Sequence, residues 1–229
     1  MPGVFAHNLF HRVGDPRTGA DVLRDVSLEA PAGSVTAVVG PEGAGKTSLL
    51  HLLAGLDRPA GGTVVVDDRP LRGLDDLELT RLRRDSIGLL LPAASVLPTI
   101  TVRENVALPL LIARRPPEEG AVDALLERVG LAGHSSVRPD QLTAAERQRA
   151  ALARALVGRP SVLLADEPAG DLDPDEAAEL LALLRDVAHE DGVTVVLFTR
   201  DADAAAAVAD QVVALDGGRI AAAAAPLAA

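Results

Sequence analysis

Short apolar runs alternate with helix-like segments along most of the chain. Residues 22–30 alternate apolar and polar positions, as in a half-buried strand. Residues 34–39 form a β-branched run, typical of a buried strand, and residues 47–55 follow a helical pattern. Further strands are predicted at residues 62–67, 87–91, 162–165, 193–199 and 211–215. With helices between most of these strands, the pattern predicts an α/β fold whose sheet has parallel character.

The strand pattern stops between residues 92 and 158. Helical patterns dominate there, at residues 101–113, 121–129 and 144–156. We therefore predict one domain over residues 1–229, in which a helical subdomain is inserted into the core. The predicted boundaries are 1–91 and 158–229 for the core and 92–157 for the subdomain. The alanine-rich end, residues 220–229, is predicted to fray.

The composition disfavours several classes of protein. The 229 residues carry 22 basic and 33 acidic groups, for a net charge of −11, so we expect no nucleic-acid partner. Without cysteine, the chain offers no disulfide and no thiolate zinc site. We see no signal peptide at the start, and no uncharged stretch reaches the roughly 18–20 residues that a membrane-spanning helix needs. We therefore expect a cytoplasmic domain.

A glycine-rich segment follows the strand at residues 34–39. It fits the pattern G-x-x-x-x-G-K-[ST], formed here by Gly40, Pro41, Glu42, Gly43, Ala44, Gly45, Lys46 and Thr47, with Ser48 next. Backbone N–H groups of such a loop can curl around phosphate oxygens, and the following helix adds its dipole. Lys46, the only lysine among 22 basic residues, would reach the β- and γ-phosphates, and Thr47 would place its hydroxyl on Mg²⁺.

The bland alternative for this segment is a glycine-rich turn before a helix. The preceding strand, the following helix and the sole lysine favour the phosphate site. Phosphates repel the carboxylate of Glu42, so we expect that side chain to point outward.

A second buried strand, residues 162–165, ends in two carboxylates. Asp166 would stand at its carboxyl end, where it can hold Mg²⁺ through water. Glu167 follows directly and could orient and polarise an attacking water. The alternative is a strand that happens to end at an acidic turn, and the phosphate-loop motif makes that alternative weaker.

Together these motifs resemble the ATPase subunits of ABC transporters, most like the macrolide-export and lipoprotein-release type. The resemblance covers residues 23–220 and includes residues 104–110, 138–142, 146–156, 170–173 and 216–220. It implies a P-loop NTPase fold: a RecA-like core with an antiparallel β subdomain and an inserted α-helical subdomain.

The resemblance also implies partners. In that family two subunits sandwich two ATP molecules, each site combining one subunit's P-loop with the other's signature loop, and closure drives a membrane permease. The partner would be a second copy or another ABC ATPase, with Asp173 in the loop that touches it. The inserted helices would dock on the permease, at the inner face of the cell membrane.

The sequence departs from the family at three motifs. The signature Leu-Ser-Gly-Gly-Gln/Glu is degenerate: Thr143 keeps a hydroxyl, but Ala144 and Ala145 add methyl groups. The glutamine expected after residues 87–91 is Pro92, and the histidine expected after residues 194–199 is Arg200. Arg200 either contacts the γ-phosphate in place of histidine or is a solvated surface residue.

The family's adenine-stacking aromatic is absent as well. It would lie near Val13, where Phe10 and His11 are the available substitutes. With few aromatic residues in the chain, little ring stacking is available for a base.

These departures predict that ATP binding outlasts turnover. A well-placed acid, base or water-orienting group contributes about 10²–10⁴-fold in rate. We therefore expect slowed hydrolysis, with Glu167 and Arg200 as the catalytic candidates. One alternative is a non-hydrolysing, nucleotide-sensing regulatory module. A second is an ATPase acting on DNA or ribosomes, but such proteins resemble coiled-coil or tandem-domain chains.

Overall fold

The structure, a computed structural model, describes residues 3–14, 19–91 and 96–221. Pro92 and residues 222–229 of the alanine-rich end lie outside these ranges. In the described part, an antiparallel sheet has the order β2-β1-β4-β5. Its strands are β1 (Val4–Val13), β2 (Ala20–Ala30), β4 (Gly61–Val66) and β5 (Arg69–Pro70).

The second sheet has the order β10-β9-β3-β8-β7-β6. It is parallel from β9 to β6, and β10 pairs antiparallel with β9. Its strands are β3 (Val35–Val39), β6 (Ile87–Leu90), β7 (Val162–Asp166), β8 (Thr194–Thr199), β9 (Gln211–Asp216) and β10 (Arg219–Ile220). The predicted α/β fold is confirmed, although Ile220, expected in the frayed end, lies in β10.

Helices connect most of the core strands. They are α1 (Lys46–Leu53), α2 (Asp76–Ser86), α3 (Val102–Ile112), α4 (Ala121–Arg128), α5 (Ala144–Leu156), α6 (Pro174–Asp191) and α7 (Ala202–Val208). Side chains fix several of their starts: Asp75, Thr101 and Thr143 each accept a hydrogen bond from the backbone of the first turn of α2, α3 and α5.

Strand β1 was not predicted, because a bulge interrupts its alternation. Asn8 has a left-handed φ of 47°, and the pairing with β2 shifts between Ala6 and Leu9. His7 and Asn8 are therefore both exposed, whereas Ala6 and Leu9 are buried. The period-two pattern of a half-buried strand is lost at this point.

The apolar core lies on both faces of the parallel sheet. Helix α1 packs between the two sheets, where Leu49 and Leu53 join a cluster with Phe198 of β8. On the opposite face, Leu163 and Leu197 pack with residues of α5 and α6. Burying one such side chain contributes about 1.5–3 kcal/mol. The two layers hold α1 and the ends of β3, β7 and β8 in fixed positions.

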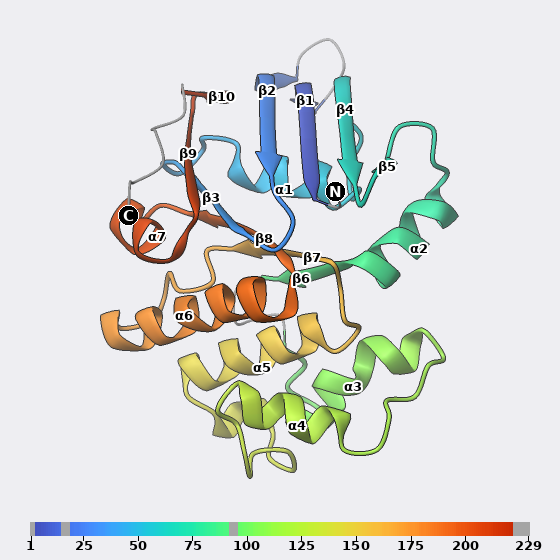
Figure 1. Cartoon of the computed structure of the whole chain (residues 1–229), viewed down its shortest axis with the longest axis vertical. Helices are drawn as coiled ribbons and strands as arrows, with labels where there is room; N and C mark the ends of the chain where they lie inside the picture. Colours follow the sequence, from blue (N-terminus) through green and yellow to red (C-terminus); the bar gives the residue numbers. More distant parts are fainter. Residues whose placement is uncertain (1–2, 15–18, 92–95, 222–229) are drawn as a thin grey trace.

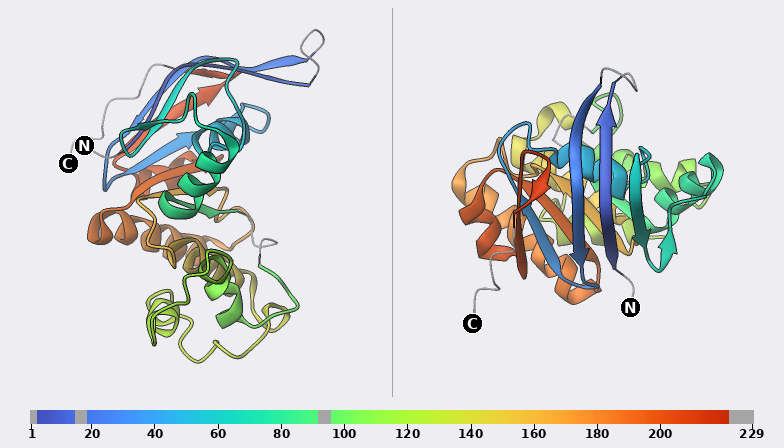
Figure 2. Two further views of the ribbon diagram at one scale, coloured as in Figure 1. Left: turned by 90° about the vertical axis from the view of Figure 1, so that its right-hand side faces the viewer. Right: turned by 90° about the horizontal axis from the view of Figure 1, so that it is seen from above.

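Helices α3, α4 and α5 gather on the side of the parallel sheet away from the antiparallel sheet (Figures 1 and 2). Helix α5 packs against β6 and α6 as well as against α3. It therefore joins the helical part to the core. Among the described residues, no helix has the combination of length and apolar character that crossing a bilayer requires.

Candidate functional site

Three parallel strands end at one edge of the sheet and bring distant segments together. The register pairs Val39 with Thr199 and Asp166 with Phe198. At this edge the Gly40 N–H donates to the Thr199 carbonyl at 3.1 Å. Loops that follow the carboxyl ends of such strands form the usual ligand crevice of an open α/β sheet.

The glycine-rich loop, residues 40–45, has positions that only glycine satisfies. A Cβ on Gly40 would lie 2.2 Å from the Leu215 carbonyl oxygen. Gly45 has φ +105°, and a Cβ there would lie 2.8 Å from Cδ2 of Leu23. Helix α1 starts directly after Gly45, so the first N–H groups of the helix, which have no intrahelical partner, lie beside this loop.

Lys46 is buried beneath the loop, with 7% of its surface exposed. Its Nζ donates to the carbonyl oxygens of Gly40 at 2.7 Å and Pro41 at 3.1 Å. It also lies 3.3 Å from Oε1 of Glu167. The ammonium group is thus held by acceptors from both sides of the crevice.

Glu167 places its carboxylate between two cations. Besides Lys46, the Nε of Arg200 lies 3.4 Å from Oε1 of Glu167, and the Arg200 N–H donates to Oε2 at 3.2 Å. Glu167 adopts a left-handed φ of 43°, and its N–H donates to the Phe198 carbonyl at 2.8 Å. This strained conformation of a non-glycine residue directs the carboxylate away from the end of β7 and toward Lys46.

Asp166 and Thr47 meet across the crevice. Thr47 Oγ1 donates to Oδ2 of Asp166 at 3.2 Å. Burial raises the pKa of Asp166, and the nearby Glu167 charge acts in the same direction, while the Thr47 hydrogen bond opposes them. A hydroxyl and a carboxylate in contact are the hard oxygen donors that Mg²⁺ prefers, so these residues fit that ion.

A cleft of about 560 Å³ opens at this edge. Most of the predicted site residues line it. The lining residues are Val22, Glu42, Gly43, Gly45, Lys46, Thr47, Ser48, Asp166, Glu167 and Arg200. Gly40, Pro41 and Ala44 complete the loop behind them. Glu42, expected to point outward, is exposed and also lines the cleft.

Val22 was missed by the sequence motifs. It belongs to β2 of the antiparallel sheet, and nothing in its local pattern marks it as a site residue. The proposed aromatic substitutes do not line the cleft. A Cβ on Gly61 would lie 3.4 Å from the Phe10 ring, and the buried His11 lies 3.4 Å from Oδ2 of Asp57.

The degenerate signature forms the start of α5. The Glu146 N–H donates to Thr143 Oγ1 at 3.2 Å, and the Thr143 N–H donates to Oε2 of Glu146 at 2.8 Å. Ala144 is partly buried, and Ala145 is buried. These residues do not line the cleft of their own chain. Asp173 caps α6 by accepting the Glu176 N–H at 2.9 Å.

The fold and the cleft define a class of protein. A parallel sheet whose glycine-rich loop leads into a helix that begins with a lysine, beside a neighbouring strand that ends in acidic residues, is a P-loop nucleotide-binding domain. The family model described as "ABC transporter" matches residues 23–170. The chain belongs to this family and is an ATP-binding subunit of an ABC transporter.

Two relatives have the same printed name, lipoprotein-releasing system ATP-binding protein LolD. The protein from Myxococcus xanthus is 45% identical over 183 residues, which cover 79% of this chain and 82% of the relative. The protein from Bordetella pertussis is 43% identical over 202 residues, which cover 87% of each.

Two solved structures match 95% of this chain. The dimeric cassette MJ0796 bound to ADP and Pi has a TM-score of 0.85 at 32% identity, and the match covers 95% of this chain and 96% of that one. The cbiO1 protein of Clostridium perfringens has a TM-score of 0.85 at 26% identity, covering 95% and 86%. The resemblance inferred from the sequence is confirmed.

Proposed function

We propose that this chain binds Mg-ATP at residues 40–48, hydrolyses it slowly in a dimer sandwich and drives a membrane permease. The observation that carries the proposal is the buried Lys46, which meets Glu167 at 3.3 Å in a cleft that Asp166 and Thr47 also line. This arrangement unites a phosphate-binding loop, a metal-binding pair and a carboxylate for water. Family members in general hydrolyse ATP.

The loop and Lys46 would bind the triphosphate. The N–H groups of the loop and of the start of α1 donate to phosphate oxygens, and Lys46 exchanges its carbonyl partners for the β- and γ-phosphates. Thr47 and Asp166 would hold Mg²⁺, directly and through water, and the ion would neutralise phosphate charge. The Val22 side chain would contact the nucleotide as an apolar surface of the cleft.

Glu167 and Arg200 would act on the reacting groups. Glu167 orients the attacking water and accepts its proton. Arg200, in place of histidine, stabilises the charge that develops on the γ-phosphate. What favours this role over a plain surface position is that Arg200 lines the cleft and contacts Glu167.

Two features would slow the reaction. Thr143, Ala144 and Ala145 would approach the γ-phosphate bound to the partner subunit, where the two methyl groups keep the backbone N–H groups at a distance. Pro92 supplies no side-chain amide. In a homodimer, both nucleotide sites would carry all of these departures and Arg200. With an intact second ATPase, one site would carry only Pro92 and Arg200, and the other only the altered signature.

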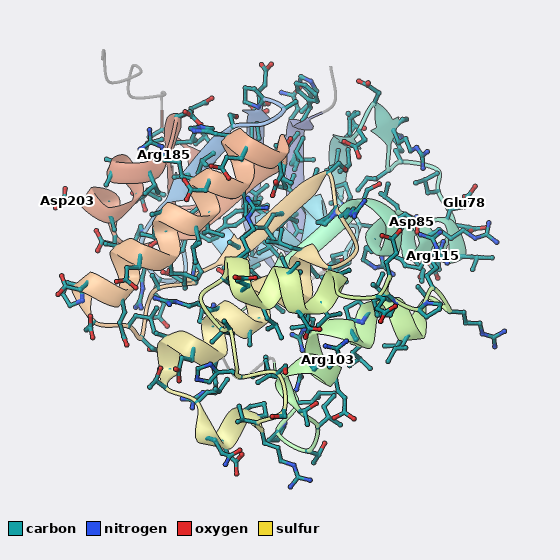
Figure 3. The ribbon with its side chains drawn as sticks, turned by 60° about the horizontal axis from the view of Figure 1, so that its bottom comes forward. Glu78, Asp85, Arg103, Arg115, Arg185 and Asp203 are labelled. Atoms are coloured by element: carbon teal, nitrogen blue, oxygen red, sulfur yellow. The ribbon has the colours of Figure 1, made fainter. Side chains whose placement is uncertain are left out.

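The helical part, residues 92–157, would be the inserted subdomain that docks on the permease. Its exposed apolar side chains support this role: Leu97 is 43% exposed, Leu111 53% and Ile112 74%. Arg115 and Asp85, whose ion pair at 3.1 Å joins this part to α2, lie next to each other in Figure 3. The permease would hold the chain at the inner face of the cell membrane.

A phosphate-release assay tests the proposal. The purified chain with Mg-ATP should release phosphate, and Glu167→Gln should abolish the release while ATP still binds. If the wild-type chain bound ATP but released no phosphate, alone or with its permease, a non-hydrolysing regulatory module would replace the transport ATPase.

A further inference from the structure

Gln148 is a buried polar side chain that the proposed mechanism does not use. It lies on α5, and 1% of its surface is exposed. Its Nε2 donates to the Leu91 carbonyl at 3.2 Å, whereas its buried Oε1 has no hydrogen-bond partner among the described residues. Ala145 and Leu152, on the same face of α5, are buried and apolar.

An apolar residue would fill this position without an unpaired polar atom. Buried amides are usually fully hydrogen-bonded, and a half-satisfied one is costly. The cost of the unpaired Oε1 is offset if the hydrogen bond to Leu91 has a role that an apolar side chain cannot fill.

Leu91 marks the point where the chain leaves the core sheet. The last pair of β6 and β7 is Leu90 with Ala165, so Leu91 is level with Asp166 on the neighbouring strand. The next residue, Pro92, has no N–H to offer. The hydrogen bond from the Gln148 amide thus links helix α5 to the strand end beside Asp166.

The degenerate signature lies at the start of the helix that carries Gln148. Thr143 caps α5 five residues before Gln148, and the helix is continuous between them. A small shift of the strand end would be carried to Thr143, because a helical turn is rigid and the Gln148 side chain is buried.

We propose that Gln148 is a positioning residue that transmits nucleotide occupancy at the Asp166 edge to the start of α5. The inference rests on the proposed function, because it requires Mg-ATP in the cleft. Gln148 itself touches no nucleotide. Its amide keeps α5 in register with the strand end, so that filling the cleft orders the signature segment.

Hydrogen–deuterium exchange of α5 amides, with and without Mg-ATP, tests this coupling. In the wild-type chain ATP should slow exchange in α5. Gln148→Met keeps the length and burial of the side chain but removes the donor. We expect it to bind a fluorescent ATP analogue like wild type, while its ATP-dependent protection falls about tenfold, the net value of one hydrogen bond.

The matched control is Gln141→Met. Gln141 is exposed in the same helical part, where its Oε1 accepts the Arg138 N–H at 3.1 Å. It should keep wild-type protection. Gln148→Glu is a second test if the methionine variant folds poorly: a buried carboxyl has a raised pKa, and its protonated form can donate to Leu91. Protection should return in this variant as the pH is lowered.

Three results would overturn the role proposed for Gln148. They are ATP-dependent protection in Gln148→Met equal to that of wild type, a loss of protection in Gln141→Met equal to that in Gln148→Met, or α5 exchange in wild type that ATP does not change. The binding measurement separates these from a failure of the proposed function. If the wild-type chain bound no analogue, the nucleotide site itself would be wrong.

Discussion

Replacing Arg200 by alanine separates a catalytic cation from a surface ion pair. The Arg200 side chain is 58% exposed, and its Nε lies 3.4 Å from Glu167. The backbone N–H that donates to Oε2 of Glu167 remains in any variant of this position. The substitution therefore removes the guanidinium and leaves the main-chain support of Glu167 in place.

The two roles predict effects of different size. An exposed ion pair contributes about 0.2–1 kcal/mol, which changes a rate by at most about fivefold. An arginine that stabilises the transition state of phosphoryl transfer contributes about 10³–10⁵-fold. We expect Arg200→Ala to lose about 10³-fold in turnover while ATP affinity stays within about fivefold of wild type.

The assay is phosphate release at saturating Mg-ATP, for wild type, Arg200→Ala and Arg200→His. Arg58→Ala is the matched control, because Arg58 is also 58% exposed and pairs with Asp76 at 2.9 Å outside the cleft. The control should turn over like wild type. Equal rates for the wild type and both Arg200 variants would refute a catalytic role for this guanidinium.

Two further predictions concern the metal pair and the signature. Because burial raises the pKa of Asp166, the folded chain holds this proton more tightly than the unfolded chain. The stability that this bound proton gives to the folded chain is lost as the pH rises through the raised pKa. The neutral side chain of Asp166→Asn avoids this loss, so the variant should have a higher Tm than wild type near about pH 7, and the difference should vanish toward about pH 3. A constant gain would contradict this. The double variant Ala144→Gly, Ala145→Gly should raise turnover about tenfold, measured by phosphate release, and lower the free energy of unfolding by about 2 kcal/mol, measured in urea. Unchanged turnover would show that the two methyl groups do not slow the reaction.

The sequence determined the parallel core well because its strands are short, apolar and bounded by turns. In β7, Leu163 faces α5 and α6 while Leu164 faces α1, so the strand reads as a continuous apolar run. Helix α5 was predicted with its observed bounds, because Thr143 and Glu146 form a capping box at its start.

Other features depend on contacts that local patterns do not encode. The bulge at Asn8 hid β1, and Val22 enters the cleft from the second sheet. The left-handed conformation of Glu167, which turns its carboxylate toward Lys46, is supported by a hydrogen bond to Phe198 of β8 and does not follow from residue type. Neither motif nor propensity predicts such a conformation for glutamate.

Binding of a fluorescent ATP analogue with Mg²⁺ tests the central claim, that the loop around Lys46 grips a triphosphate. Wild type should saturate, and Lys46→Ala should lose saturable binding while remaining folded. Lys46→Arg should lose it as well, since the buried ammonium fits between the Gly40 and Pro41 carbonyls and a planar guanidinium does not. Saturation of Lys46→Ala with wild-type affinity, or no saturation of wild type, would contradict the account.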